Sequence, residues 1–331
     1  YRPAEGENRI LVRNGLEVIN KRSNVGIHCL IESANLGKKV INTGQILFML
    51  APRLNAVGRM GSAQTGVELV TCRDLVQAKK IAQQLESDNR MRRNIDEKTL
   101  KEALQLVETE VDLPEDKIIV LAKENWHPGV IGIVASRLVE RYYRPVILIA
   151  VDDGVGRGSA RSIRGFDIHA ALREAAGLLA EYGGHKYAAG LSIASDRISE
   201  FREQVKAYAK QTIDEETLVS TIDVDADLQL QDINTELVKT LERFAPYGTQ
   251  NPQPVFMSEG LTVVGTPRVL QKSHLKFRVQ QNDAVFDAIA FGMIEHLYKL
   301  QNQPSVDLVY NVEENTWNGQ TNIQLRVKDI H

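Results

Sequence analysis

Apolar runs alternate with helical patterns in the middle of this 331-residue chain. Between residues 117 and 211, runs typical of buried strands are separated by segments with the spacing of amphipathic helices. One helix is expected from Gly129 to Tyr143. Another is expected to begin at Asp167 as its N-cap and to end before the pair Gly183-Gly184. The alternation predicts a small α/β domain with a sheet.

A long helix is predicted before this domain. From Arg73 to about Glu110 the chain contains no proline or glycine, and apolar residues recur at helical spacing. One long helix or two joined helices fit this pattern and would act as a connector. Residues 1 to about 70 carry short helical patterns and a punctuated decapeptide, Pro52 to Gly61.

Beyond the polar patch Asp214-Glu215-Glu216 the pattern changes to that of strands. Apart from one helical stretch, Ile233 to Phe244, turn signals separate short alternating runs. Five runs have this pattern: Leu261–Val264, Leu275–Val279, Val285–Phe291, Val306–Val312 and Ile323–Val327. Short strands at regular spacing predict a small barrel or sandwich.

The composition is that of a soluble globular protein, with 43% hydrophobic and 25% charged residues. No run is apolar enough for a membrane span or a signal peptide. The two cysteines, Cys29 and Cys72, lack the spacing of a metal or redox motif, so we expect buried thiols in a reducing cytoplasm. Residues 1–212 carry 31 Lys and Arg against 26 Asp and Glu, and the remainder carries 9 against 17. Nucleic-acid binding would therefore have to rest on local arginine clusters.

The first candidate site lies between Gly156 and Gly165. Its polar residues are Arg157, Ser159, Arg161 and Ser162. Glycines let a ligand approach the backbone, hydroxyls donate, and guanidinium groups match phosphate oxygens. The helix that begins near Asp167 would add its positive end. The pattern favours a phosphate-binding loop, and a solvated hairpin loop fits it equally well.

The second candidate site combines Gly183-Gly184-His185 with Ala188-Ala189-Gly190. The glycine pair fits a helix C-cap, but a cap does not explain the run of small residues. Small side chains beside a histidine leave room for a bulky ligand against the backbone. His185 is therefore a candidate catalytic residue that donates to a phosphate or to a leaving oxygen.

Two further segments carry candidate binding residues. His127, before Pro128, is expected at a helix N-terminus, where a ligand contact and a structural cap are both open. Gly129 and Gly132 would permit close packing of that helix on a strand. Arg53, Asn55 and Arg59 lie in the decapeptide, where surface ion pairs are the ordinary alternative. No set of histidines and carboxylates has metal-ligand spacing, and no P-loop, dinucleotide or serine-elbow motif is present.

These segments together resemble the RecJ family, the single-strand-specific 5′ to 3′ DNA exonucleases of the DHH phosphoesterase superfamily. The resemblance covers essentially the whole chain. Six motifs carry it: Gly158-Ser159-Ala160-Arg161-Ser162, Gly183-Gly184-His185 with Ala188-Ala189-Gly190, His127 to Ala135, Pro52 to Arg59, Phe244 to Gly248, and Asn251 to Phe256.

The resemblance implies an α/β plus β architecture in four parts. Residues 1–72 would be the tail end of the DHH catalytic domain, 73–114 a long connecting helix, 115–212 a DHH-associated α/β domain with a mixed sheet, and 217–331 an OB-type β-barrel. OB barrels stack bases of a single strand on aromatic rings. The candidate rings are Phe277, Phe286, Phe291, Tyr310 and Trp317. The acidic balance of the barrel region predicts a narrow track for the strand or a partner-binding role.

The resemblance also implies Mn(II) or Mg(II) in the full-length enzyme, held by aspartates and an Asp-His-His triplet that this chain lacks. We therefore expect a C-terminal fragment that holds no metal, binds single-stranded DNA through Ser159, Arg161, His185 and Arg53 or Arg59, and does not hydrolyse it. A single-strand-binding protein or a helicase is a candidate partner. The alternatives are another DHH-family oligonucleotide phosphodiesterase, a non-catalytic single-strand-binding module, and a tRNA-synthetase appendage with the same associated fold.

Overall fold

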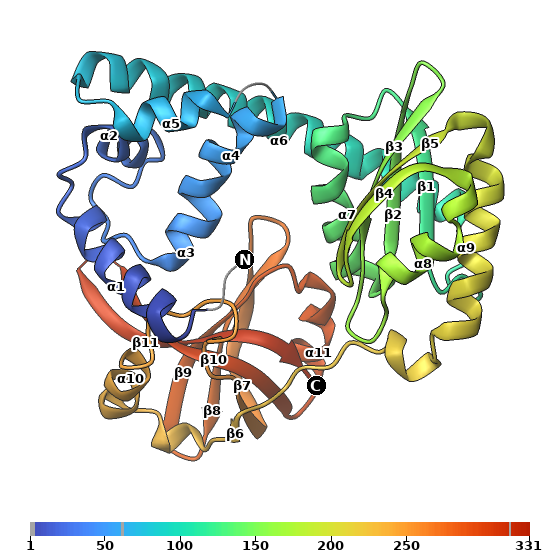
Figure 1. Ribbon diagram of the computed structural model, residues 1–331. Helices are drawn as coiled ribbons and strands as arrows, with labels where there is room; N and C mark the ends of the chain where they lie inside the picture. Colours follow the sequence, from blue (N-terminus) through green and yellow to red (C-terminus); the bar gives the residue numbers. More distant parts are fainter. Residues whose placement is uncertain (1–3, 61–62, 318) are drawn as a thin grey trace. The chain divides into compact units, whose positions relative to one another are not determined.

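The computed structural model describes residues 4–60, 63–317 and 319–331. They form two compact units (Figure 1). The first contains Arg22–Val40 and Gly44–Thr221, and the second combines the chain up to Lys21 with Ile41–Thr43 and Ile222–His331. Among these described residues, no helix is both long and apolar enough to cross a lipid bilayer.

One long helix, α6 (Leu75–Glu110), dominates the helical part of the first unit. Asp74 caps it by accepting from the Gln77 amide at 2.6 Å. This confirms the predicted long helix as a single helix. The shorter helices before it are α2 (Val25–Ser33), α3 (Thr43–Gln45), α4 (Ala51–Met60) and α5 (Gln64–Thr71), with a π-helical turn at Ile46–Leu50.

The predicted α/β domain has a five-stranded mixed sheet in the order β1-β2-β3-β5-β4. Its strands are β1 (Ile119–Glu124), β2 (Val146–Asp152), β3 (Val155–Arg161), β4 (Leu179–His185) and β5 (Ala188–Ala194). β1 and β2 are parallel, and the other neighbours are antiparallel. The fold class predicted from the sequence is confirmed for this part of the chain.

Helices pack on both faces of this sheet. On one face lies α7 (Pro128–Tyr142), whose Val134 and Leu138 bury themselves against β1 and β2. On the other face lie α8 (Ile168–Glu174) and α9 (Ile198–Thr212). Ala188 and Gly190 of β5, together with most of β4, remain exposed. The sheet therefore has an open area beside α7.

Two expectations for this domain are wrong. The helix capped by Asp167 ends at Glu174, so Gly183 and Gly184 lie in β4 and do not form a C-cap. Their extended backbones pair with the small residues of β5, and this tertiary pairing overrides the local helix-end signal. The segment from Gly156 to Arg161 is likewise a strand, β3, and not a loop. α8 packs on the face opposite Arg161, so its N-terminus does not face that side chain.

The second unit contains a closed five-stranded barrel. Its strands are β7 (Phe256–Leu270), β8 (His274–Gln281), β9 (Ala284–Ala290), β10 (Val306–Trp317) and β11 (Gln320–Ile330). Pairing runs β7-β8-β9-β11-β10, and β10 returns to β7 to close the barrel. All five predicted strands and the OB-type barrel are confirmed. The remaining elements are α1 (Gly6–Asn20), β6 (Ala226–Asp227), α10 (Thr235–Glu242) and α11 (Leu297–Asn302).

The candidate aromatic rings of the barrel differ in how deeply they are buried. Phe277 and Tyr310 lie in the core, and burial raises the pKa of the Tyr310 hydroxyl to about 12 although Ser258 bonds to it at 2.6 Å. Phe286 is half-buried, whereas Phe291 is 48% exposed. The side chain of Trp317 lies outside the described residues. Phe291 is thus the ring best placed for a ligand.

Candidate nucleic-acid interface

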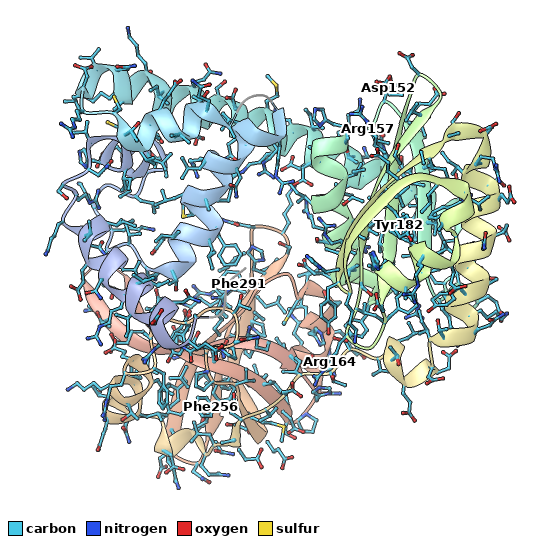
Figure 2. The ribbon with its side chains drawn as sticks, in the orientation of Figure 1. Asp152, Arg157, Arg164, Tyr182, Phe256 and Phe291 are labelled. Atoms are coloured by element: carbon cyan, nitrogen blue, oxygen red, sulfur yellow. The ribbon has the colours of Figure 1, made fainter. Side chains whose placement is uncertain are left out.

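Three polar side chains of β3 share the sheet face that α7 covers. Arg157, Ser159 and Arg161 alternate along the strand, so their side chains point the same way. Their partners on β2 are Ala150, Leu148 and Val146, which belong to the core under α7. Figure 2 labels Arg157 on β3 and Tyr182 on β4.

The same face continues across β5 and β4 with small residues. Ser159 lies opposite Gly190, and Gly190 lies opposite Gly183. Arg161 lies opposite Ala188, and Ala188 lies opposite His185. We call the surface formed by these six residues the open sheet face. Neighbouring strands are about 4.8 Å apart, so the backbones of Arg161 and His185 are separated by roughly 10 Å of glycine- and alanine-lined surface.

Helix α7 presses against one edge of the open sheet face. A Cβ at Gly132 would lie 2.7 Å from Arg161 Nη2 and 2.8 Å from Ser159 Oγ, so glycine is what allows both side chains to fit. The prediction that Gly132 permits close packing is confirmed. Arg161 Nη1 donates to Ser159 Oγ at 3.0 Å and to the Ala160 carbonyl at 2.7 Å. Burial lowers the pKa of Arg161, and the charge of Arg59 lowers it further. An anion there would relieve both effects.

The N-terminus of α7 brings two more predicted residues to this edge. His127 is the N-cap, and its Nδ1 accepts from the Gly129 amide at 3.0 Å. Arg59 of α4 donates to the Gly129 carbonyl at 3.0 Å. Asn55 precedes Arg59 by one helical turn, and both are exposed. The prediction of a helix N-terminus at His127 is confirmed. Of the two roles left open for the His127 ring, the structure shows the structural cap.

Three predicted site residues have structural roles within the protein. Arg53 is buried, and its guanidinium pairs with Glu86 at 2.6 Å and with the Met49 carbonyl at 2.5 Å. Ser162 Oγ donates to the Phe166 carbonyl at 2.9 Å. Gly184 has φ +146°, and a Cβ there would lie 2.5 Å from the Ala188 carbonyl oxygen. Gly184 therefore lets β4 approach β5 closely. Of the two arginines in the decapeptide, Arg53 is buried and Arg59 is available to a ligand.

The barrel carries a second basic surface. A cavity of about 740 Å³ is lined by cations of β7 and β8, namely Arg268, Lys276 and Arg278, and by Asp287 of β9, which pairs with Lys276 at 3.2 Å. Near one end of β9, the Phe291 ring lies 5.5 Å from the Arg326 guanidinium and 5.2 Å from the His274 ring. Three cations thus line one cavity, although the region as a whole carries more acidic than basic residues.

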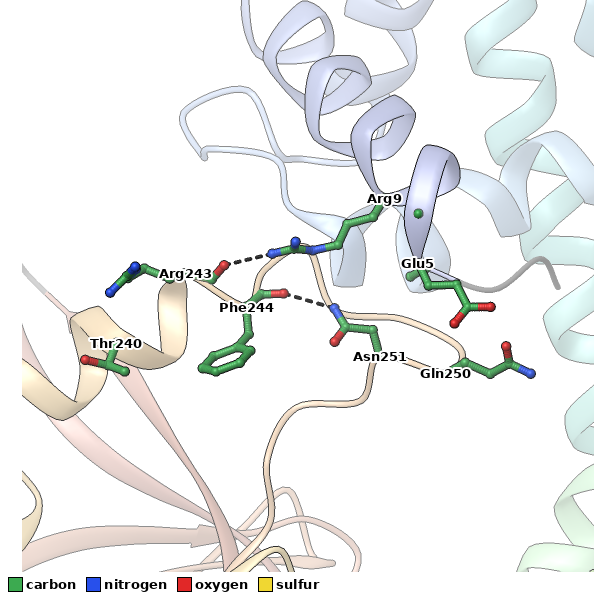
Figure 3. A pocket seen from close by; sticks show the side chains of 9 residues that line it. Glu5, Arg9, Thr240, Arg243, Phe244, Gln250 and Asn251 are labelled. Atoms are coloured by element: carbon green, nitrogen blue, oxygen red, sulfur yellow. Dashed lines mark hydrogen bonds between the residues drawn. The ribbon is translucent and has the colours of Figure 1, made fainter.

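A second cavity, of about 580 Å³, lies beside the Phe244 to Gly248 motif (Figure 3). Arg9 of α1 donates to the carbonyls of Arg243 and Ala245 at 2.8 and 3.0 Å, and Ala4 donates to the Thr249 carbonyl at 2.7 Å. Asn251 Nδ2 bonds to the carbonyls of Phe244 and Pro246 at 2.9 and 3.0 Å. The motif therefore anchors the start of α1 to the barrel unit.

Within 4–60, 63–317 and 319–331, no group of three or more His, Cys, Asp or Glu side chains lies close enough to hold an ion. These residues do not fit a divalent-metal site. Both cysteines are free, Cys29 buried and Cys72 half-buried. The chemistry that the described site supports is anion binding.

An α/β domain with a mixed five-stranded sheet, joined to an OB-type barrel, defines the class of this protein. Two family models match the chain: DHHA1 domain over residues 115–211 and RecJ OB domain over residues 224–329. The chain is 32% identical to the single-stranded-DNA-specific exonuclease RecJ of Bacillus subtilis and 31% identical to that of Escherichia coli, over 99% of its own length and 42% and 58% of theirs.

Solved structures agree with these matches. The crystal structure of RecJ from Thermus thermophilus in complex with Mg²⁺ superposes with a TM-score of 0.84 at 32% identity, over 99% of this chain and 50% of that one. A further RecJ, bound to manganese, gives 0.54 at 38% identity over 62% of this chain and 50% of that one. The chain therefore resembles a RecJ portion that carries the DHHA1 and OB domains, and it spans about half the length of the curated relatives it matches.

Proposed function

We propose that this chain supplies the strand-holding part of a 5′ to 3′ exonuclease that acts on single-stranded DNA. The observation that carries the proposal is the open sheet face, where Ser159, Arg161 and His185 project from the same side of the sheet across exposed glycine and alanine. A phosphate at Ser159 and Arg161 would gain charge-assisted hydrogen bonds, and the adjoining nucleoside would lie against backbone.

In this proposal the residues have separate roles. Arg161 and Ser159 bind a terminal or scissile phosphate, with Arg59 and Arg157 adding charge from beside it. His185, across the small residues, is the candidate catalytic contact to a phosphate or leaving oxygen. His127 holds the N-terminus of α7, and through it Gly129, in place. Gly183 leaves room for the nucleoside.

The barrel would hold the rest of the strand. Its Arg268, Lys276 and Arg278 lie beside one cavity, and the exposed Phe291 ring offers a base a surface for stacking. This second binding surface favours a strand-degrading enzyme over a phosphodiesterase of short oligonucleotides or a tRNA-synthetase appendage. The retained Ser159 and Arg161 favour the same reading over a non-catalytic module.

The domain boundaries are 1–72, 73–114, 115–212 and 217–331, with the first being the tail of a DHH domain. The whole protein would use Mn(II) or Mg(II), in keeping with the metal-bound crystal structures of RecJ. A single-strand-binding protein or a helicase would be its partner, and its location would be cytoplasmic.

The experiment that tests the proposal measures binding and cleavage with the same 5′-labelled oligothymidylate. We expect this chain to bind the single strand with salt-dependent affinity and to leave it intact when Mn²⁺ is added, since the described residues hold no metal ligand set. A duplex of equal length serves as the specificity control. Equal affinity for the duplex would contradict the proposed substrate, and Mn²⁺-dependent degradation by highly purified protein would contradict the division of roles.

A further inference from the structure

The middle of α6 buries polar side chains where the rest of the helix buries apolar ones. Asn89, Arg92, Asp96 and Thr99 continue the spacing of the buried face, and each is at most 9% exposed. Before them on the helix, Glu86 pairs with Arg53 of α4, and after them, Ala103 and Val107 share a core cluster with α7. Buried polar groups are costly unless they are paired, so this cluster needs an explanation.

Hydrogen bonding within the cluster is incomplete. Arg92 Nη2 donates to Asn89 Oδ1 at 3.2 Å, and Arg92 Nη1 lies 3.9 Å from Asp96 Oδ2. Among the described residues, the donors Arg92 Nε and Asn89 Nδ2 and the acceptor Asp96 Oδ1 have no hydrogen-bond partner. Asn89 is 0% exposed. Two of these three atoms are N–H donors, and the Arg137 guanidinium lies 3.5 Å from the third, Asp96 Oδ1. Donors are therefore in excess, and the ligand that complements donors is an anion.

Charge in the cluster is also unbalanced. Asp96 is shared by Arg92 and by Arg137 of α7, whose Nη1 lies 3.5 Å from Asp96 Oδ1. Burial lowers the pKa of Arg92, Asp96 opposes that effect, and the charges of Arg93, Arg59 and Arg137 lower it further. The carboxylate of Asp96 therefore serves two guanidinium groups, Arg92 of α6 and Arg137 of α7.

Arg59 connects this cluster with the open sheet face. Its charge acts on Arg92 and also on Arg161, and its guanidinium donates to Gly129 at the N-terminus of α7. Arg59 is exposed, and the Arg137 side chain is 43% exposed, so both are available to a ligand, whereas Arg92 adds charge from beneath them. The guanidinium groups of Arg161, Arg59 and Arg137 thus form a series that extends past the N-terminus of α7 to the middle of α6.

We infer that Arg59, Arg92 and Arg137, with Asp96 holding the latter two, form a second phosphate site for the strand whose first phosphate lies at Arg161. The inference rests on the proposed function, since it takes the ligand to be the same DNA backbone. Its consequence is that binding to a strand with several phosphates uses Arg137, whereas binding to a single nucleotide does not.

The test compares Arg137→Gln with Arg141→Gln, which removes the same charge from the exposed surface of α7 one turn later. Affinities are measured for thymidine 5′-monophosphate and for a 5′-phosphorylated octathymidylate over a range of salt. We expect Arg137→Gln to weaken octamer binding about three- to tenfold, to reduce the log-log salt slope by roughly 0.7, and to leave the mononucleotide unchanged. Arg141→Gln should match the wild type with both ligands.

The outcomes separate this inference from the proposed function. If Arg161→Gln weakens both ligands while Arg137→Gln binds the octamer like the wild type, the second phosphate site is refuted and the proposed function stands. If Arg161→Gln has no effect on either ligand, both fail. Because Arg137 lies at the surface, its variant tests the site without disturbing the buried Arg92, whose replacement would also alter folding.

Discussion

Replacing Arg161 with glutamine is expected to weaken binding of single-stranded DNA by roughly 10- to 100-fold. Hydrogen bonds to charged groups contribute about 1.5 to 3 kcal/mol, and about 1.4 kcal/mol corresponds to a tenfold change in affinity. The salt slope should fall by roughly 0.7 for the lost phosphate contact. Fluorescence anisotropy with a labelled oligothymidylate, titrated at several salt concentrations, measures both quantities.

Two further variants decide how this result is interpreted. Gly132→Ala should also weaken binding, because the added Cβ would displace Arg161 Nη2 and Ser159 Oγ without removing any charge. Arg197→Gln removes a guanidinium that pairs with Glu200 at 3.1 Å on the surface, and its binding should equal that of the wild type. An unchanged salt slope for Arg161→Gln would show that this side chain does not contact phosphate.

Filling the open sheet face with a leucine at Gly190 is expected to weaken strand binding strongly, down to what the barrel alone provides, while the protein stays folded. A Cβ at Gly190 would meet only the Gly158 carbonyl oxygen, at an ordinary contact distance of 3.8 Å, so the sheet accepts a side chain there. That side chain would project between Ser159 and Gly183, where the nucleoside is proposed to lie. Thermal melting and anisotropy on the same samples separate the two effects.

The matched control for this variant is Gly177→Leu. Gly177 lies in the turn after α8, also has open space for a Cβ, and lies outside the open sheet face. Its variant should bind the strand normally. A Gly190→Leu protein with an intact melting transition and wild-type affinity would exclude the open sheet face as the binding surface.

Much of the fold was predictable because periodicity reports burial directly. The α/β alternation, the long helix and the five barrel strands all follow from apolar spacing, and each is present. The failures occurred where local and tertiary signals conflict. Gly183 and Gly184 have the composition of a helix end, yet pairing with β5 makes them a strand. The short glycine-rich segment 156–161 was likewise predicted as a loop, because nothing in its own sequence indicates that it pairs with a strand on each side.

The candidate site was predictable in its residue types but only partly in its geometry. Ser159, Arg161, Gly183 and His185 do share one face, because they occupy matching register positions on β3 and β4, with β5 between them. The burial of Arg53 could not be predicted from the sequence, because its ion-pair partner, Glu86, lies on another helix. The cluster on α6 does not appear in the apolar spacing, because its buried residues are polar. Its signal is that Asn89, Arg92 and Asp96 keep the spacing of the buried face.

The most direct test is a crystal structure of this chain with a 5′-phosphorylated oligothymidylate. Our account predicts a phosphate about 3 Å from Ser159 Oγ and the Arg161 guanidinium, with its nucleoside resting on Ala188 and Gly190. A strand that binds only to the barrel, with no nucleotide on the open sheet face, would contradict the account.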